Sequence, residues 1–241
     1  MLHLRELRRR LMQYVAVVLV LVGGFWLIRE PLFQALIAPL MASEYAPESL
    51  IFTSVAELFF TYLKLSFISA FFVSIPYLVW QIWRFAAPGM YKHEKRFILP
   101  LLTLSPALFY AGGAFMYYFV MPIIVDFFLS FSAPGLAALP TVGAYLSFLL
   151  KMVFGFGLAF ELPVILLLLV SVGAIKPEQL AYFRRYALVI ILLIAAVLTP
   201  PDPISQLMLA IPMYMLYELA VLAAKLIAKN KQQNTTEEGT Q

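Results

Sequence analysis

The chain has 241 residues, of which 63% are hydrophobic and only 12% are charged, and its mean hydropathy is +0.91. Soluble domains carry about 25% charged residues, so this composition predicts an integral membrane protein with no separate soluble domain. The absence of cysteine excludes disulfides, thiolate metal sites and cysteine nucleophiles. The net charge of +4 resides in polar connections and not in a basic patch interleaved with aromatic residues, so no nucleic-acid partner is expected.

The distribution of positive charge predicts how the chain is oriented in the membrane. Fourteen of the 17 Lys and Arg residues lie in four polar segments, at 1–10, 84–96, 173–185 and 223–241. The intervening connections, at 29–56, 126–145 and 200–205, contain only Arg29. Basic residues near the ends of spans stay on the cytoplasmic side. The pattern therefore predicts an all-α protein with six transmembrane helices and both termini in the cytoplasm.

The apolar runs differ in length. They cover residues 11–28, 58–83, 97–125, 145–170, 186–201 and 203–217. The first four are long enough for a hydrocarbon core of ~30 Å, which needs about 20 helical residues. The last two have about 15 residues each and are predicted to be short helices that thin the bilayer or form a shallow hairpin. Three prolines in the third run, Pro100, Pro106 and Pro122, are expected to bend it.

Two outer connections and the C-terminal tail complete the predicted organisation. Residues 31–41 and 127–145 are largely apolar, so connections 29–56 and 126–145 are expected to form a cap on the outer face. Residues 230–241 are polar without apolar periodicity and are predicted to be a disordered cytoplasmic tail. Residues 1–229 are accordingly assigned to one membrane domain.

Common enzymatic motifs are missing. The sequence contains no phosphate-binding glycine loop, and its two histidines, His3 and His93, lie in cytoplasmic segments outside any zinc-protease motif. The aspartates Asp126 and Asp202 fall at the predicted outer surface, so they cannot form a buried proteolytic pair. No enzymatic activity, metal site or cofactor is expected.

Glu161 is the most unusual acidic residue because it lies deep in the fourth run. A carboxyl group inside a membrane is costly and indicates a functional contact. A structural interpretation stays open, in which the neutral acid hydrogen-bonds within the bundle or pairs with Lys64 or Lys151. These residues also allow an alternative function, a proton-coupled small-solute transporter in which Glu161 carries the proton. The lack of paired broken helices in matching halves counts against that alternative.

Glu6 and Glu94 are both assigned to the cytoplasmic face. Glu6 precedes Arg9 and Arg10 by three and four residues, a spacing that favours an ion pair on a helix surface. Glu94 lies at the start of the third run, where a carboxylate suits the positive end of the helix dipole. A second interpretation is that both carboxylates accept guanidinium groups from a partner.

An ordered set of motifs resembles the TatC family, the multispanning subunit of the twin-arginine protein translocase. The set consists of His3-Leu4-Arg5-Glu6-Leu7-Arg8-Arg9-Arg10-Leu11, Ala38-Pro39-Leu40, Trp83-Arg84-Phe85 with Ala87-Pro88, Tyr91-Lys92-His93-Glu94-Lys95-Arg96, Phe160-Glu161-Leu162-Pro163, Thr199-Pro200-Pro201-Asp202 with Ser205-Gln206, and Ala210-Ile211-Pro212. The resemblance covers essentially the whole chain, with matching span count and orientation.

The resemblance implies a receptor in the cytoplasmic (inner) membrane that binds the twin-arginine signal peptides of folded export substrates. It assigns signal-peptide binding to Glu6, Arg8, Phe85 and Glu94. It assigns partner contacts and transport to Pro39, Glu161, Asp202 and Gln206. The implied partners are membrane lipid, TatA-like and TatB-like single-span subunits, and further copies of the chain, with the proton gradient as energy source.

Overall fold

The computed structural model describes residues 2–47, 49–86, 92–131, 140–199 and 202–238, with side chains placed except at 2–4, 86, 92–97 and 227–238. This part of the chain is helical, apart from an isolated bridge between Ile51 and Thr141, which confirms the all-α prediction. The elements are α1 (Leu2–Leu27), α2 (Arg29–Met41), α3 (Glu57–Val73), α4 (Ile75–Ala86), α5 (Lys92–Phe115), the π-helix η2 (Met116–Val120), α6 (Met121–Leu129), α7 (Val142–Phe160), α8 (Leu162–Ser171), α9 (Pro177–Tyr182), α10 (Arg184–Leu198) and α11 (Pro203–Glu238).

Each predicted span corresponds to a helical stretch. Within the described residues, four stretches are long and apolar enough to cross a membrane, namely Arg5–Leu27, Ile98–Leu129, Val142–Ser171 and Pro203–Leu226. Helices α3 and α4 make a fifth if the pair, bent by 48°, counts as one span. Helix α10 has only 15 residues, or about 22 Å, and is short as predicted. The crossing of all six and the cytoplasmic position of both termini stay predictions.

The prediction of a short sixth helix is wrong. The apolar part of α11 extends from Pro203 to Leu226, well past the expected end at residue 217. The predicted run ends directly before Glu218, a charged residue that interrupts the apolar sequence. In the folded chain, the Glu218 carboxylate lies 2.9 Å from Arg184 Nε and accepts a 3.1 Å hydrogen bond from the Tyr214 hydroxyl. This pairing offsets the cost of the charge, so the helix continues beyond it.

The third predicted span is a continuous helix with a local change of winding. Helix α5 contains Pro100 and Pro106 and leads through η2 into α6, which carries Pro122 near its start. A proline has no N–H, and its ring presses on the carbonyl four residues earlier. The carbonyl four residues before Pro122 is that of Tyr118, which lies in η2. The wider π turn gives this carbonyl room beside the proline ring. Pro100 and Pro106 thus lie within α5 without ending it, and the change of winding is found only before Pro122.

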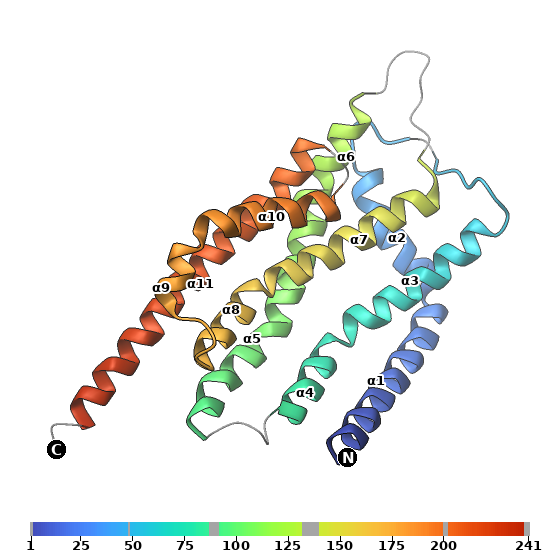
Figure 1. The fold of residues 1–241 in the computed structure, drawn as a ribbon. Coiled ribbons are helices and arrows are strands. Elements are labelled where there is room, and N and C mark those ends of the chain that lie inside the picture. The colour runs from blue at the N-terminus through green and yellow to red at the C-terminus, as the bar shows by residue number, and fades with distance from the viewer. Residues whose placement is uncertain (1, 48, 87–91, 132–139, 200–201, 239–241) are drawn as a thin grey trace. The chain divides into compact units, whose positions relative to one another are not determined.

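The chain divides into two compact units, and the first comprises residues 1–88 and 112–156. In this unit α1 runs along α3, and α2 lies against both α3 and α6 (Figure 1). Its core consists of large side chains that are fully buried, including Leu65, Met116, Met121, Leu149 and Phe156. Apolar packing of this kind holds together helices that share no regular backbone hydrogen bonds.

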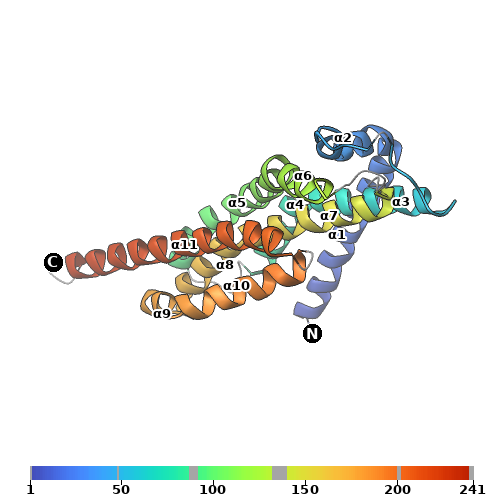
Figure 2. The same cartoon turned by 90° about the horizontal axis from the view of Figure 1, so that it is seen from above.

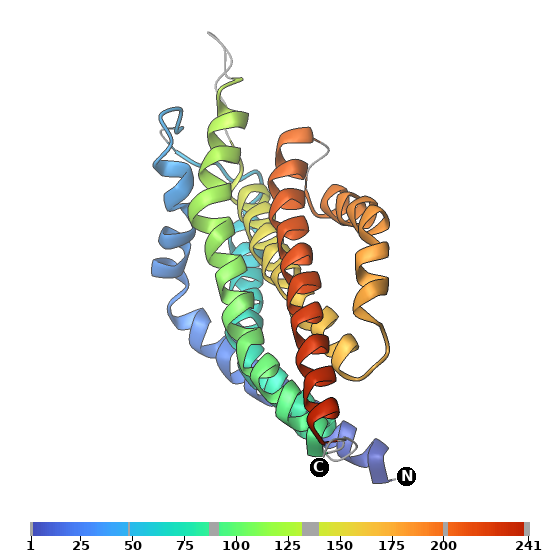
Figure 3. The same cartoon turned by 90° about the vertical axis from the view of Figure 1, so that its left-hand side faces the viewer.

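The second unit comprises residues 89–111 and 157–241. Here α10 lies beside α11, and α9 packs against both at one end (Figure 2). Figure 3 displays the difference in length between α10 and α11. The Tyr217 hydroxyl donates a 2.6 Å hydrogen bond to the Leu180 carbonyl, which fastens α9 to α11. Helix α11 continues to Glu238, beyond residue 230, where the predicted tail starts. The domain and tail assignments stay predictions.

The two connections expected to form the outer cap contact each other in the first unit. Val142 N–H donates to the Ile51 carbonyl at 2.9 Å, and the Ser43 hydroxyl donates to Asp126 at 2.5 Å. Glu57 also accepts a 2.9 Å bond from Gly143 N–H. Connections 29–56 and 126–145 are thus joined, and much of the first is the helix α2. Their position on the outer side of the membrane stays a prediction.

Pro39 leaves one backbone carbonyl of α2 without its helical partner, and a tyrosine supplies the missing donor. Because it lies inside α2, the Ala35 carbonyl lacks the helix hydrogen bond that residue 39 would otherwise donate. The Tyr117 hydroxyl, from η2, donates to this carbonyl. The next carbonyl, of Leu36, accepts a 3.3 Å bond from Tyr145 on α7. Helix α2 is therefore fixed to η2 and α7 through two backbone carbonyls of the turn before Pro39.

This arrangement predicts coupling between Pro39 and Tyr117. Tyr117→Phe should lower the free energy of unfolding by about 1–3 kcal/mol, because it leaves the Ala35 carbonyl without a partner. In a Pro39→Ala background the same change should cost clearly less, since the introduced alanine has an N–H that can bond the carbonyl. Chemical denaturation of the four variants in detergent measures the difference. Equal costs in both backgrounds would contradict the proposed role of the hydroxyl.

Candidate functional site

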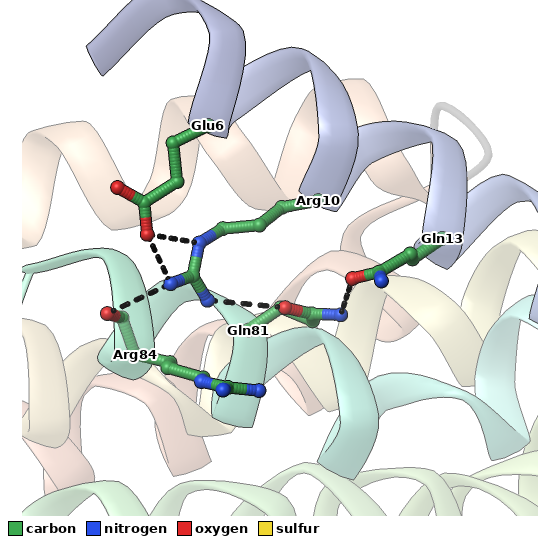
Figure 4. A network of polar contacts seen from close by, with 5 residues as sticks. All are labelled: Glu6, Arg10, Gln13, Gln81 and Arg84. Atoms are coloured by element: carbon green, nitrogen blue, oxygen red, sulfur yellow. Dashed lines mark hydrogen bonds and ion pairs between the residues drawn. The ribbon is translucent and has the colours of Figure 1, made fainter. Parts of the chain in front are cut away.

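The start of α1 is held against α4 by the side chain of Arg10. Its guanidinium pairs with the Glu6 carboxylate one turn earlier, with a distance of 3.1 Å from Nε to Oε1 (Figure 4). It also donates to Gln81 Oε1 and to the Arg84 carbonyl, each at 3.3 Å. The ion pair favoured by the i, i+4 spacing is thus confirmed. Arg10 additionally joins two helices, which local spacing could not indicate.

Gln81 links this contact to further polar groups. The residue is only 5% exposed, and its amide nitrogen donates to the Tyr77 hydroxyl at 2.7 Å and to Gln13 at 3.5 Å. At Ser74, the residue between α3 and α4, the Tyr14 and Ser74 hydroxyls lie 2.9 Å apart. Buried polar groups linked in this way fix the register of two helices, because a shift would leave several of them unsatisfied.

A hollow of about 430 Å³ lies over this network. It is lined by Arg5, Glu6, Arg9, Arg10, Gln13 and Arg84, so a single carboxylate stands among four arginines. The Glu6 side chain is 43% exposed, whereas that of its partner Arg10 is 14% exposed. The Arg84 guanidinium lies over the Trp80 ring, 5.3 Å from its centroid. Glu6 is thus oriented by a largely buried arginine and stays accessible at the surface of the hollow.

The other residues assigned to signal-peptide binding are placed differently. Arg8 lines a second hollow, of about 590 Å³, on a neighbouring face of α1, together with Arg5, Arg9, Met12, Gln13 and Ala16. Phe85 follows Arg84 near the end of α4 and is 38% exposed. Glu94 lies on α5, but its side chain is outside the described part of the structure, as are residues 87–91.

Glu161 lies at the break between α7 and α8, not inside a continuous helix. Pro163, the second residue of α8, cannot donate a backbone hydrogen bond, so the chain makes a turn at Glu161 before the helix resumes. The Ser105 hydroxyl of α5 contacts the carboxyl group. The carboxyl atom Oε1 is buried and has no hydrogen-bond partner among the described residues. A buried acid is therefore only partly satisfied, in an otherwise apolar environment.

Asp202 and Gln206 organise the start of α11. Asp202 immediately precedes the helix, and its Oδ2 accepts a 2.7 Å bond from Ser205 N–H, the arrangement of an N-cap. Gln206 donates a 3.1 Å hydrogen bond to the Leu192 carbonyl of α10. Both residues therefore fix the junction of α10 and α11, while the neighbouring residues 200–201 lie outside the described part.

The sequence analysis missed several of the polar residues that define these contacts. Gln13, Gln81, Tyr117 and Glu218 were not singled out. The available signal was a polar side chain in an otherwise apolar helix, which has to find a partner when it is buried. In the part of the chain that the structure describes, no cluster of three or more His, Asp or Glu residues could hold a metal ion.

The fold and these buried polar contacts define a multi-pass helical membrane protein. The profile of the family described as Sec-independent protein translocase protein (TatC) matches residues 2–212. The chain belongs to this family, whose members are components of a protein translocase.

Relatives and solved structures support the assignment. A relative named Sec-independent protein translocase protein TatC from Halothiobacillus neapolitanus is 44% identical, over 95% of this chain and 63% of the relative. A relative of the same name from Magnetococcus marinus is 41% identical, over 99% of this chain and 88% of the relative. The Escherichia coli relative is 38% identical over 92% of this chain and 86% of its own length. Two crystal structures of the twin-arginine translocase receptor TatC, one in the detergent DDM, are 40% identical, with TM-scores of 0.79 and 0.80. They cover 93% and 92% of this chain, and 98% and 99% of their own chains. The chain thus spans less than two thirds of the first of these relatives and most of the others.

These findings do not favour the solute-transporter alternative. Lys64, a possible structural partner of Glu161 in the sequence, instead donates a 2.9 Å hydrogen bond to the Ser147 hydroxyl. The family match describes protein translocation and not solute uptake.

Proposed function

We propose that this chain is the receptor subunit of a twin-arginine translocase and binds Arg-Arg signal peptides at the cytoplasmic face. The observation that supports the proposal most directly is the accessible Glu6 carboxylate at the hollow over α1 and α4. Membership of the TatC family and the likeness to crystal structures described as the twin-arginine translocase receptor support it further.

The electrostatics of the hollow indicate that Glu6 does not act alone. Arg10 already compensates its charge, and Arg5, Arg9 and Arg84 add positive potential. A guanidinium from a signal peptide would share the carboxylate with Arg10 in this setting. A second carboxylate is therefore needed for net attraction, and we assign this role to Glu94. Arginine suits such sites better than lysine because its planar fork forms two parallel hydrogen bonds with one carboxylate.

Arg8 and Phe85 complete the proposed peptide site. Arg8 lines the hollow that neighbours the one containing Glu6, and Phe85 offers an exposed ring at the end of α4. The charge pattern supports a position of this site in the cytoplasm, with both termini on the same side of the inner membrane. The membrane domain would comprise residues 1–229, followed by the tail.

We further propose that Pro39, Glu161, Asp202 and Gln206 serve partner binding and transport. The partly satisfied carboxyl group of Glu161 is suited to a polar group on a TatA-like or TatB-like helix. Pro39, Asp202 and Gln206 would act by fixing the outer helix ends described above. The chain would work without enzymatic activity, in a complex with further copies of itself, and would use the proton gradient.

A direct test measures binding of fluorescent signal peptides to the purified chain in detergent. The Arg-Arg peptide should bind more tightly than the same peptide with Lys-Lys. Glu6→Ala should weaken Arg-Arg binding more than Lys-Lys binding, since only arginine uses the bidentate geometry. Glu30→Ala is the matched control, because Glu30 is also an exposed helical carboxylate beside an arginine, Arg29, at 3.9 Å. Equal binding of the two peptides to the unmodified chain would contradict the receptor proposal.

A further inference from the structure

Arg185 is held in a compact cluster with two tyrosines where α9 meets α10. Its guanidinium lies 5.4 Å from the ring centroid of Tyr182 and 4.9 Å from that of Tyr186. The same side chain donates hydrogen bonds from Nη2 to both phenol oxygens, at 3.2 and 3.3 Å. Tyr182 and Tyr186 are 65% and 47% exposed. The guanidinium is thus fixed in position at the surface.

The groups of this cluster that remain available for hydrogen bonding are donors. Because both phenol oxygens accept a bond from Arg185, the hydrogen of each hydroxyl is available for donation. The guanidinium contributes further N–H groups and no acceptor. The cluster therefore presents donors and one positive charge, a combination that recognises an anion, and phosphate oxygens fit the planar guanidinium best.

The adjacent arginine has a different environment. Arg184 pairs with Glu218 of α11, so its charge is compensated within the chain. The ion pairs found among the described residues join Arg10 with Glu6, Arg29 with Glu30 and Arg184 with Glu218, and none includes Arg185. Its positive charge therefore has no carboxylate partner in the described part of the chain.

The surroundings indicate where the anion comes from. From Leu188 onward, α10 presents a row of exposed apolar side chains, which are Leu188, Val189, Ile190, Leu193, Ile194 and Val197. Such a surface suits acyl chains, and exposed tyrosines beside an arginine are typical of the membrane–water interface. Phosphate groups of lipids lie at the same level. With only 15 residues, α10 also benefits from a fixed position at one interface.

We infer that Arg185, Tyr182 and Tyr186 form a binding site for the phosphate of a membrane phospholipid. The headgroup phosphate accepts hydrogen bonds from the guanidinium and the two hydroxyls, while the acyl chains lie along the apolar face of α10. The bound lipid anchors the start of the short helix at the membrane surface. This site is separate from the proposed signal-peptide site on α1 and does not depend on it.

Native mass spectrometry of the full chain, titrated with phosphatidylglycerol in detergent, tests the inference. Arg185→Ala should weaken binding of the tightest lipid about tenfold, because it removes the charge-assisted bonds. Arg185→Lys should weaken it about threefold, because the charge stays and the fork is lost. Changing both Tyr182 and Tyr186 to Phe keeps the rings but should also weaken binding by a few-fold. Diacylglycerol, which lacks the phosphate, should not occupy the site.

Two controls make the result decisive. Lys225→Ala removes an exposed positive charge elsewhere in the same unit and should change the affinity less than about twofold. If Lys225→Ala and Arg185→Ala lower the lipid affinity equally, the effect comes from net charge alone, and the inference is overturned. Displacement of the lipid by an equal concentration of inorganic phosphate would also overturn it, because the site would then select free phosphate. Unchanged lipid binding in Arg185→Ala, with the helical circular dichroism retained, would have the same consequence.

Discussion

Replacement of Glu94 by lysine is expected to lower the affinity for an Arg-Arg signal peptide by at least about 30-fold. The loss of one member of a hydrogen-bonded charge pair costs roughly 2–5 kcal/mol, and lysine adds repulsion to that loss. Glu94→Gln should be milder, because an acceptor oxygen remains. The surroundings of Glu6 support this large effect, since Arg10 compensates its charge and leaves most of the net attraction to a second carboxylate.

Titration of a fluorescent signal peptide against the purified variants measures this change. Glu178→Lys makes the same charge change at an exposed residue of α9 that has no assigned role, and it should bind the peptide like the unmodified chain. If Glu94 only stabilises the start of its helix, Glu94→Lys will alter thermal stability slightly and leave peptide affinity unchanged. That outcome would remove Glu94 from the receptor site.

Glu161→Ala is expected to abolish most export while signal-peptide binding stays intact. If a polar group of a partner helix bonds this carboxyl, its loss should weaken helix association roughly 10- to 100-fold, because hydrogen bonds to charged groups contribute about 1.5–3 kcal/mol. Glu161→Gln should retain more export than Glu161→Ala if hydrogen bonding is what matters. Export of a folded reporter and crosslinking to single-span partners measure the two effects.

Ser105→Ala separates the partner contact from an internal structural role. This change removes the hydroxyl that contacts Glu161 inside the chain but keeps the acid. If Glu161 binds a partner, export in Ser105→Ala should stay close to normal. If the two residues form only an internal pair, both alanine variants will lose membrane-inserted protein to a similar degree, and the proposed partner contact will be wrong.

The helical segments followed from the sequence because apolar length is a local property. A run without charge must be helical in lipid, where every backbone group needs an internal partner. The ion pair of Glu6 and Arg10 was predictable for the same reason, since an i, i+4 spacing brings two side chains together in any helix. The short α10 could likewise be recognised from the length of its apolar run.

The tertiary structure decided where polar side chains find partners far away in the chain. It placed Glu218 beside Arg184, which lengthened the sixth helix beyond the expected end. It brought Tyr117 to the carbonyl that Pro39 leaves without a partner, and Gln81 to Arg10. The sequence alone determined the helices, their apolar character and the charge pattern that predicts their orientation. The pairing of buried polar groups depended on the packing of helices, because the cost of burying such a group can be offset by any suitable partner that the fold brings within reach.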